Sequence, residues 1–180
     1  MLKHCVYGAK AWKSISNADV IGGFRKRTLI MSMFFEDLKV GEKFKAQFSR
    51  TVTETDVVNF LNISGTFESI LIDKEHYEKS SFGKRVAPGI LILAISMGLS
   101  SLLALTDSTA VALLGLDHVK FLKAVAIGDT LSTTVEITDK RVTRNPAHGI
   151  VTYKHTTQNQ KGEAVLEFER IQLVKTKVSP

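Results

Sequence analysis

Near residue 106 the spacing of hydrophobic residues along the chain changes from a helical period to an alternating one. Upstream of that point, Thr53-Glu54-Thr55-Asp56 has the form of a capping box and predicts a helix that ends near Ser64-Gly65. Residues 73–79 predict a short surface helix with Asp73 as its N-cap. A strand over residues 43–53 is expected to precede both helices.

The longest apolar segment runs from Ile90 to Leu105, and twelve of its sixteen residues are Ile, Leu, Met or Ala. A helix that is apolar on every side is expected to be buried on every side. At ~1.5 Å per residue it would span roughly 24 Å, short of the ~30 Å core of a bilayer, and Ser and Gly residues interrupt it. We therefore expect one long helix enclosed by a sheet, a polar loop ahead of it, and no membrane partner.

Four strands are predicted after this helix, beginning with residues 111–122. In the second strand, polar residues alternate with a set of inward positions, namely Leu131, Thr133, Val135 and Ile137. Residues 149–158 and 163–175 complete an antiparallel meander, with turns at Gly128-Asp129 and Lys161-Gly162. One strand, then helices, then a run of strands is the order of an α+β domain.

Composition and charge are typical of a single globular domain. At 180 residues, 44% hydrophobic and 23% charged, the chain can bury one substantial core. Its net charge of +6 is uneven, because residues 1–32 carry +5 and the remaining chain only +1. A nearly neutral body offers no basic face, so no nucleic-acid partner is expected. Cys5 is the single cysteine, which excludes an internal disulfide.

We predict two parts in the chain: a basic N-terminal leader or extension over residues 1–32, and the globular domain over residues 33–180. The leader is basic, poor in acidic residues and mildly amphipathic, as organelle-targeting segments are. Two other interpretations stay open: that the true start is Met31 or Met33, or that the leader is an ordered addition. We expect a cytoplasmic protein, with organelle targeting as the alternative, and no catalytic role for the leader.

The polar loop and the start of the apolar segment carry a family pattern. The pattern consists of residues 64–73, then Phe82-Gly83, then Ala87-Pro88-Gly89. It resembles, without a gap, the signature of the MaoC-like hydratases and dehydratases of acyl thioesters. Further segments resemble the opening of that family and its strand and turn after the helix: residues 36–41, 119–121 and 128–131. The resemblance implies a single hot-dog domain, in which an antiparallel sheet wraps around one long buried helix.

The departures from the family pattern fall on its catalytic positions. In the family an Asp and a His of this loop hold the water that adds across a double bond, and an N–H at the start of the helix polarises the thioester carbonyl. This chain has Thr66 where the Asp is expected and Leu71 where the His is expected. Pro88 replaces a second family His, whereas the Gly89 amide remains. Losing one positioned acid or base typically costs ~10²–10⁴ in rate.

The resemblance assigns candidate roles to five residues. Glu68 and Thr66 are the predicted catalytic residues, and Gly89, Ser69 and Asp73 are the predicted substrate-binding residues. Glu68 is the candidate to replace the missing acid, and the alternative is a solvated loop carboxylate. Thr66 occupies the catalytic position, but a hydroxyl cannot act as a base near neutral pH. Asp73 equally fits a helix cap.

Outside this loop the sequence indicates little chemistry. No cofactor and no metal site are expected, because no His, Asp or Glu pair recurs at a zinc spacing. His155 shares a predicted strand face with Val151 and Tyr153, which favours a satisfied core or interface histidine over a ligand. Several basic residues are candidate contacts for coenzyme A phosphates, and each is equally explained as a surface charge: Arg50, Lys84, Arg85, Lys120, Lys123 and Arg144.

Three functions stay open. The first is a hydratase or dehydratase of enoyl-CoA and 3-hydroxyacyl-CoA, using Glu68 or a residue of a partner subunit. The second is a non-catalytic acyl-CoA-binding or regulatory hot-dog dimer. The third, an acyl-CoA thioesterase, is ranked last because residues 90–105 contain no Asp or Glu that would activate water. The expected partners are an acyl-CoA or acyl-carrier thioester and a second copy of the chain, since hot-dog subunits usually pair with their sheets continuous.

Overall fold

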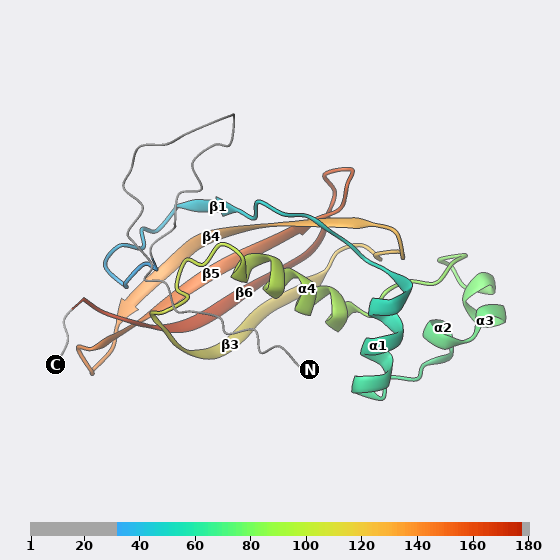
Figure 1. Ribbon diagram of the computed structural model, residues 1–180, viewed down its shortest axis with the longest axis horizontal. Coiled ribbons are helices and arrows are strands. Elements are labelled where there is room, and N and C mark those ends of the chain that lie inside the picture. The colour runs from blue at the N-terminus through green and yellow to red at the C-terminus, as the bar shows by residue number, and fades with distance from the viewer. Residues whose placement is uncertain (1–31, 178–180) are drawn as a thin grey trace, which may run out of the picture.

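The computed structural model describes residues 32–177, which form one layer of strands with a single long helix packed across it (Figure 1). Leader residues 1–31 lie outside the described residues. The helices are α1 (Glu54–Ser64), α2 (Ser69–Ile72), α3 (Lys74–Lys79) and α4 (Gly89–Ser101). The strands are β1 (Lys43–Lys45), β2 (Arg50–Thr51), β3 (Ala110–Phe121), β4 (Thr130–Val142), β5 (His148–Gln158) and β6 (Ala164–Lys175).

The sheet has the strand order β1-β4-β5-β6-β3, with β2 also paired to β4, and every pairing is antiparallel. Alternation in β4 and β5 decides which face is covered, because successive side chains of a strand point to opposite faces. The inward positions predicted in β4 are all fully buried: Leu131, Thr133, Val135 and Ile137. The α+β class is therefore confirmed, and β4, β5 and β6 form the antiparallel series that the sequence predicts. The prediction is wrong for β3, because the chain at Gly128-Asp129 crosses to the other side of the sheet and β3 pairs with β6 instead of β4.

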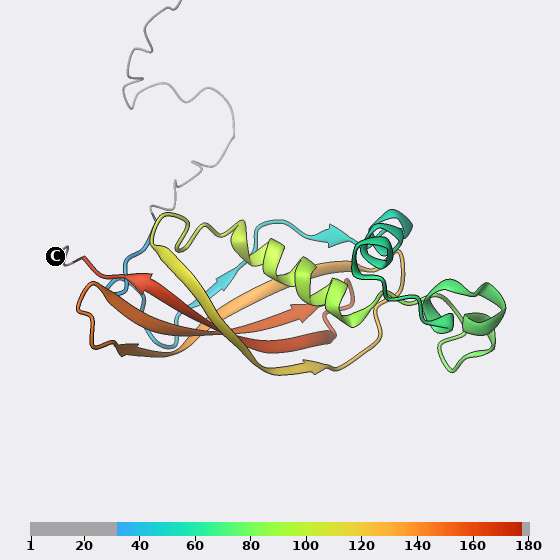
Figure 2. The same ribbon diagram turned by 90° about the horizontal axis from the view of Figure 1, so that it is seen from below.

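The sheet curves beneath α4, as the view in Figure 2 shows. Leu91, Ile92, Ile95 and Leu99 place one side of α4 in the main core cluster. Ser96 faces the sheet between them, and its Oγ accepts a 2.7 Å hydrogen bond from the hydroxyl of Thr157. The structure is thus the predicted single hot-dog domain, a helix held by an antiparallel sheet.

Two features of this helix differ from the prediction. Its outward side carries exposed residues, including Ile90, Ala94 and Gly98, so within one chain α4 is buried on one side only. The helix also ends at Ser101 instead of Leu105, because the chain tightens into a turn where Ala104 has a positive φ of 52°. That turn carries Leu103 and Leu105 into a second core cluster.

The helices ahead of α4 follow local sequence rules. Thr53 caps α1, accepting from the Asp56 N–H while the Asp56 carboxylate accepts from the Thr53 N–H, which confirms the capping box. Gly65, with a left-handed φ of 69°, ends the helix. Helices α1 to α3 lie together beyond the N-terminal end of α4 in Figures 1 and 2. The sequence did not predict α2.

The expected strand over residues 43–53 is interrupted. Lys45 pairs with Thr134 and Arg50 with Leu131, so the first strand advances five positions while β4 advances three. Two residues are therefore in excess, and they interrupt the ladder between β1 and β2. Strand β3 keeps its predicted length but pairs irregularly with β6, with three register shifts and a φ of 52° at His118.

Candidate functional site

A cavity of about 480 Å³ lies at the N-terminal end of α4, and we call it the α4 N-terminal cavity. Its walls come from the α3–α4 loop, the first turn of α4, the end of β3 with the residues after it, and one residue of β6. Most of the lining is apolar, including Phe82, Val86, Ala87, Ile92, Phe121 and Val125. Apolar walls with a few polar groups are the usual composition of a small-molecule site.

Backbone pairing fixes the start of α4 at this cavity. Val86 forms an isolated antiparallel bridge with Ala126, and the Ala87 N–H donates to the Val125 carbonyl at 2.8 Å. Pro88 is the N-cap and offers no side-chain hydrogen bond, and its carbonyl accepts the first helical bond, from Ile92. The N–H groups at the beginning of an α-helix have no acceptor within the helix and carry its positive dipole end.

Gly89 is the predicted site residue that lines the cavity. The aromatic ring of Phe121 lies directly against it, since a Cβ placed on Gly89 would be 2.9 Å from Cε1 of that ring. A side chain at position 89 would therefore collide with the cavity wall. The absence of one leaves the backbone at this point accessible from the cavity.

Lys123 is the one charged residue in the lining of this cavity. Its Nζ donates to Oε1 of Glu163 at 2.6 Å. That hydrogen bond, with a second one from Asn159, lowers the pKa of the Glu163 carboxyl. Both partners are substantially exposed, so the pair is a weak surface interaction at the cavity rim.

The other predicted site residues of the loop do not line this cavity. Thr66 is half-buried, and its Oγ1 accepts a 2.9 Å hydrogen bond from the Ser64 hydroxyl. Glu68 and Ser69 are exposed at the start of α2. The structure therefore brings Gly89 to the cavity but leaves Thr66, Glu68 and Ser69 outside its lining.

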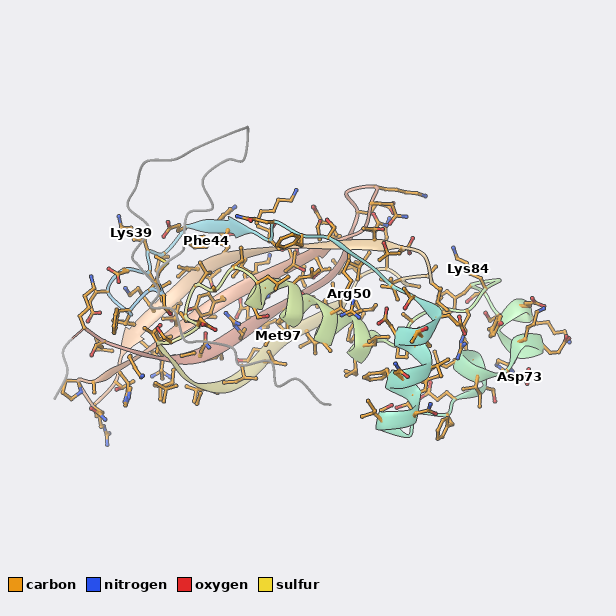
Figure 3. All side chains as sticks on the ribbon, in the orientation of Figure 1. Lys39, Phe44, Arg50, Asp73, Lys84 and Met97 are labelled. Atoms are coloured by element: carbon orange, nitrogen blue, oxygen red, sulfur yellow. The ribbon has the colours of Figure 1, made fainter. Side chains whose placement is uncertain are left out.

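Asp73 caps a helix, which is the alternative that the sequence offered for it. Its Oδ1 accepts from the backbone N–H groups of Glu75 at 3.0 Å and His76 at 3.3 Å. Figure 3 shows Asp73 at the end of the molecule, well away from the labelled Met97 of α4. Its predicted substrate-binding role stays a prediction.

Leu71 is a core residue. Its side chain is 6% exposed and belongs to the same cluster as Leu61, Ala87 and Leu91. The Leu71 carbonyl accepts a 2.6 Å hydrogen bond from Nε of Arg85, whose guanidinium also pairs with Glu54 of α1. Arg85 thus ties α2 to α1 and to the loop before α4. The sequence offered Arg85 only as a candidate phosphate contact.

His155 lies in the core, as predicted, but its ring is not satisfied. The side chain is 0% exposed and stacks on Phe168 with ring centroids 4.4 Å apart. Among the described residues neither ring nitrogen has a hydrogen-bond partner. Burial, with a smaller contribution from the Arg170 charge, lowers the pKa of His155 to about 3. The imidazole is therefore neutral at physiological pH.

Tyr153 and Arg170 accompany His155 on the inner face of the sheet. The Arg170 guanidinium lies over the Tyr153 ring, 4.7 Å from its centroid. Burial raises the pKa of the Tyr153 hydroxyl to about 12 and lowers that of Arg170. Tyr153 is fully buried and Arg170 is half-buried, and neither they nor His155 line the α4 N-terminal cavity.

Two features of the described residues bear on the remaining expectations. In residues 32–177 no group of three or more His, Cys, Asp or Glu side chains is arranged to hold a metal ion. Over the same residues, no helix has the length and hydropathy needed to cross a bilayer. The compartment in which the protein works stays a prediction from the sequence.

Fold and cavity together define a class of protein: a hot-dog domain with an apolar cavity at the start of its central helix. Residues 36–159 match the MaoC-like domain family, and the chain belongs to that family. The resemblance predicted from the loop pattern is thereby confirmed at the level of the family.

Individual relatives agree with this assignment. The chain is 33% identical over 145 residues to YdeM, an uncharacterized protein of Bacillus subtilis, a match covering 79% of this chain and 99% of YdeM. The solved structure of a monoamine oxidase regulatory protein from Archaeoglobus fulgidus is 35% identical with a TM-score of 0.76, covering 82% of this chain and 97% of that one.

An (R)-specific enoyl-CoA hydratase of Rhodospirillum rubrum is 28% identical over 141 residues, which are 78% of this chain and 91% of that enzyme. Two other curated relatives are longer proteins, and the matches span only 34% and 40% of their lengths. The family is therefore established, and the activity of this chain is a separate question.

Proposed function

We propose that this protein binds acyl thioesters in the α4 N-terminal cavity and acts as a hydratase or dehydratase of the enoyl-CoA and 3-hydroxyacyl-CoA type. The observation that carries the proposal is the apolar cavity of about 480 Å³ at the first turn of α4. Apolar walls suit an acyl chain, and N–H groups at a helix N-terminus suit a carbonyl oxygen on which negative charge develops. Family membership and the similarity to an (R)-specific enoyl-CoA hydratase support the same substrate class.

Proton transfer in this chain needs a group other than the Asp and His of the family pattern. Thr66 and Leu71 stand at those two positions, and Leu71 is packed in the core. Glu68 is our candidate for the acid or base, with a residue of a second copy as the alternative source. Glu68 does not line the cavity in the single chain, so turnover by Glu68 requires that its side chain move to the cavity when the substrate binds.

The test is hydration of crotonyl-CoA by the purified full-length chain, followed by loss of absorbance of the conjugated double bond. We expect measurable hydration, reduced ~10²–10⁴-fold in Glu68→Gln. Glu75→Gln is the matched control, since Glu75 is another exposed carboxylate of the same region, paired only with Lys79. Equal activity of both variants and wild type would contradict the role of Glu68.

A non-catalytic acyl-CoA-binding protein is the second candidate. The buried Leu71 favours it, together with the position of Thr66 and Glu68 outside the cavity lining. In this case crotonyl-CoA is not hydrated but stabilises the folded chain against heat. Its binding raises the free energy of unfolding by about 2.7 kcal/mol at a free concentration of 100 times Kd. Free coenzyme A is the control ligand. Neither stabilisation nor turnover would contradict both candidates.

A thioesterase stays the least supported candidate. Helix α4, Gly89–Ser101, contains no acidic residue that would activate water at the cavity.

We infer that the working form is a homodimer paired through β3 and the outward side of α4. Among residues 32–177, β3 lies at the edge of the sheet and is bonded to β6 alone, and an open edge strand is a template for another strand. Several large apolar residues lie exposed on these two elements: Ile90, Val111, Leu113, Leu114 and Phe121. Covering them would remove them from water. Sedimentation at the mass of a single chain would overturn the inference.

A further inference from the structure

The α4 N-terminal cavity contains two phenylalanines in different positions. Phe82 belongs to the loop between α3 and α4 and is 43% exposed. Phe121 ends β3 and is 50% exposed. Only Phe121 is among the atoms nearest to Gly89, with three ring carbons 2.9 to 3.1 Å from the place of a Cβ on that glycine.

The backbone of Phe121 is fixed by the sheet. Phe121 pairs with Leu166, and the N–H of the next residue, Leu122, donates to the Val165 carbonyl at 2.9 Å. The backbone of Phe121 is therefore held at the cavity wall, and only rotation of the side chain can move the ring away from Gly89. Phe82 has no such support, since it lies in a loop outside the helices and strands.

A carbonyl oxygen bound to the Gly89 N–H would lie ~2.9 Å from that nitrogen. The first carbons of the acyl group would then lie beside the ring of Phe121. A substituent on the carbon next to the carbonyl would need space on this side, and the ring fills the space directly over Gly89.

We propose that Phe121 is a specificity-determining residue that selects acyl groups without a branch at the carbon next to the thioester carbonyl. This inference rests on the proposed acyl-thioester function of the same cavity. Under this proposal, the width of the cavity at Gly89 discriminates between branched and unbranched acyl groups. The rest of the cavity determines which acyl chain lengths bind.

The test compares two thioesters that differ by one methyl group, crotonyl-CoA and its 2-methyl-branched analogue tiglyl-CoA. Dissociation constants are measured by calorimetry for the wild type, Phe121→Leu, Phe121→Ala and Phe82→Ala. The wild type is expected to prefer crotonyl-CoA about tenfold or more, the usual worth of one methyl group in an apolar pocket. Phe121→Ala is expected to remove most of this preference and Phe121→Leu part of it, whereas Phe82→Ala keeps the wild-type ratio.

Three outcomes would overturn the proposal: no preference in the wild type, an unchanged ratio in Phe121→Ala, or an equal change in Phe82→Ala. If the wild type binds neither thioester, the proposed function fails and this inference fails with it. Binding of both thioesters with an unchanged ratio overturns the inference alone. Sedimentation of each variant checks that the assembly is the same, and Phe121→Leu keeps an apolar side chain at the strand end should the alanine variant fold poorly.

Discussion

At position 89 a glycine is required by a neighbouring side chain and not by the backbone. Unlike Gly41, Gly65 and Gly128, Gly89 does not have a positive φ, so any residue could adopt its conformation. The constraint is the Phe121 ring at 2.9 Å from the place of its Cβ. Because that ring carbon belongs to a half-exposed side chain, an added methyl would push the ring into the cavity without unfolding the domain.

We therefore predict that Gly89→Ala folds but loses affinity for crotonyl-CoA by about tenfold or more. The amide N–H is retained in this variant, so the loss measures the displaced ring and not a missing donor. Gly98→Ala is the matched control in the same helix, because a Cβ there meets nothing within 4 Å in the single chain, and sedimentation checks that the proposed dimer is kept. Calorimetric titration of both variants checks the prediction, and equal affinities would contradict it.

His155 gives the protein a pH dependence whose sign is set by burial. Its pKa is about 3 in the folded chain, against about 6.5 for an ordinary histidine. Below pH ~6.5 the unfolded chain binds a proton at this residue while the folded chain does not. The free energy of unfolding must then fall as the pH decreases from about 6.5 toward 3, by at most ~1.4 kcal/mol per pH unit, and this residue adds no pH dependence above that window.

We predict that His155→Leu removes this part of the acid slope and is close to the wild type in stability at neutral pH. Leucine removes two buried ring nitrogens that have no partner in the described chain and keeps an apolar contact with Phe168. Urea unfolding at pH 7.5, 6 and 5 measures the slope. His76→Gln, a change at an exposed histidine of α3, is expected to keep the wild-type slope. The prediction is wrong if His155→Leu loses stability with acid as steeply as the wild type does.

At the scale of elements, α4 is apolar around its whole circumference while one chain buries only one side of it. Ala94 and Gly98 lie on the exposed side, and Ile95 and Leu99 on the buried side. The apolar residues of α4 therefore face two directions. One set contacts the sheet of the same chain, and the other set forms an outward surface that one chain leaves uncovered. This is the physical reason why a pattern that predicts complete burial gives a half-exposed helix in a single subunit.

Ala94→Glu is predicted to convert the proposed dimer to monomers with little effect on the fold of each chain. Glutamate is a good helix former, and its charge would be accommodated in water but not in an apolar interface. Thr152→Lys on β5 is the control, since Thr152 alternates with the buried Val151 and Tyr153 and its side chain lies on the opposite face of the sheet. Sedimentation velocity gives the masses. A dimer that survives Ala94→Glu would place the interface elsewhere.

The elements that could be predicted from the sequence are those fixed by neighbouring residues. The capping box at Thr53 and the left-handed Gly65 determine α1 by themselves, and alternation determines the faces of β4. The end of α4 could not be predicted, because the pull of Leu103 and Leu105 into a second core cluster depends on distant strands. The same holds for the break between β1 and β2, which depends on the register with β4.

The residues of the candidate site also divide into those that the sequence could predict and those that it could not. Gly89 could be predicted because the family pattern contains it and it directly precedes the apolar run. Phe121 was recognised only as part of a matching strand, since nothing local indicates that β3 brings its ring against Gly89. The tethering role of Arg85 could not be predicted, because its acceptors, the Leu71 carbonyl and the Glu54 carboxylate, are 14 and 31 positions away.

At the scale of the whole molecule, the described residues contain two hydrophobic core clusters. Both core clusters lie between Met33 and Val174. The first described residues bond to the segment that follows α4. The Met33 N–H donates to the Leu105 carbonyl at 2.6 Å, and the Ser32 hydroxyl accepts from the Ser108 N–H. The domain boundary after residue 32 stays a prediction from the sequence.

We predict that deleting residues 1–31 changes the free energy of unfolding by less than about 0.5 kcal/mol, the usual size of a change away from the core. Phe35→Ala is the contrasting variant and is expected to cost ~3–5 kcal/mol, because Phe35 is buried in the second core cluster.

The deletion also removes +5 of the +6 net charge. Affinity for crotonyl-CoA is expected to be unchanged at 0.15 M salt, where the Debye length is ~8 Å. If the deleted chain binds more weakly at low salt and equally at high salt, the leader attracts the phosphates of the carrier. If it unfolds more easily at both, the leader belongs to the folded domain and the boundary is wrong.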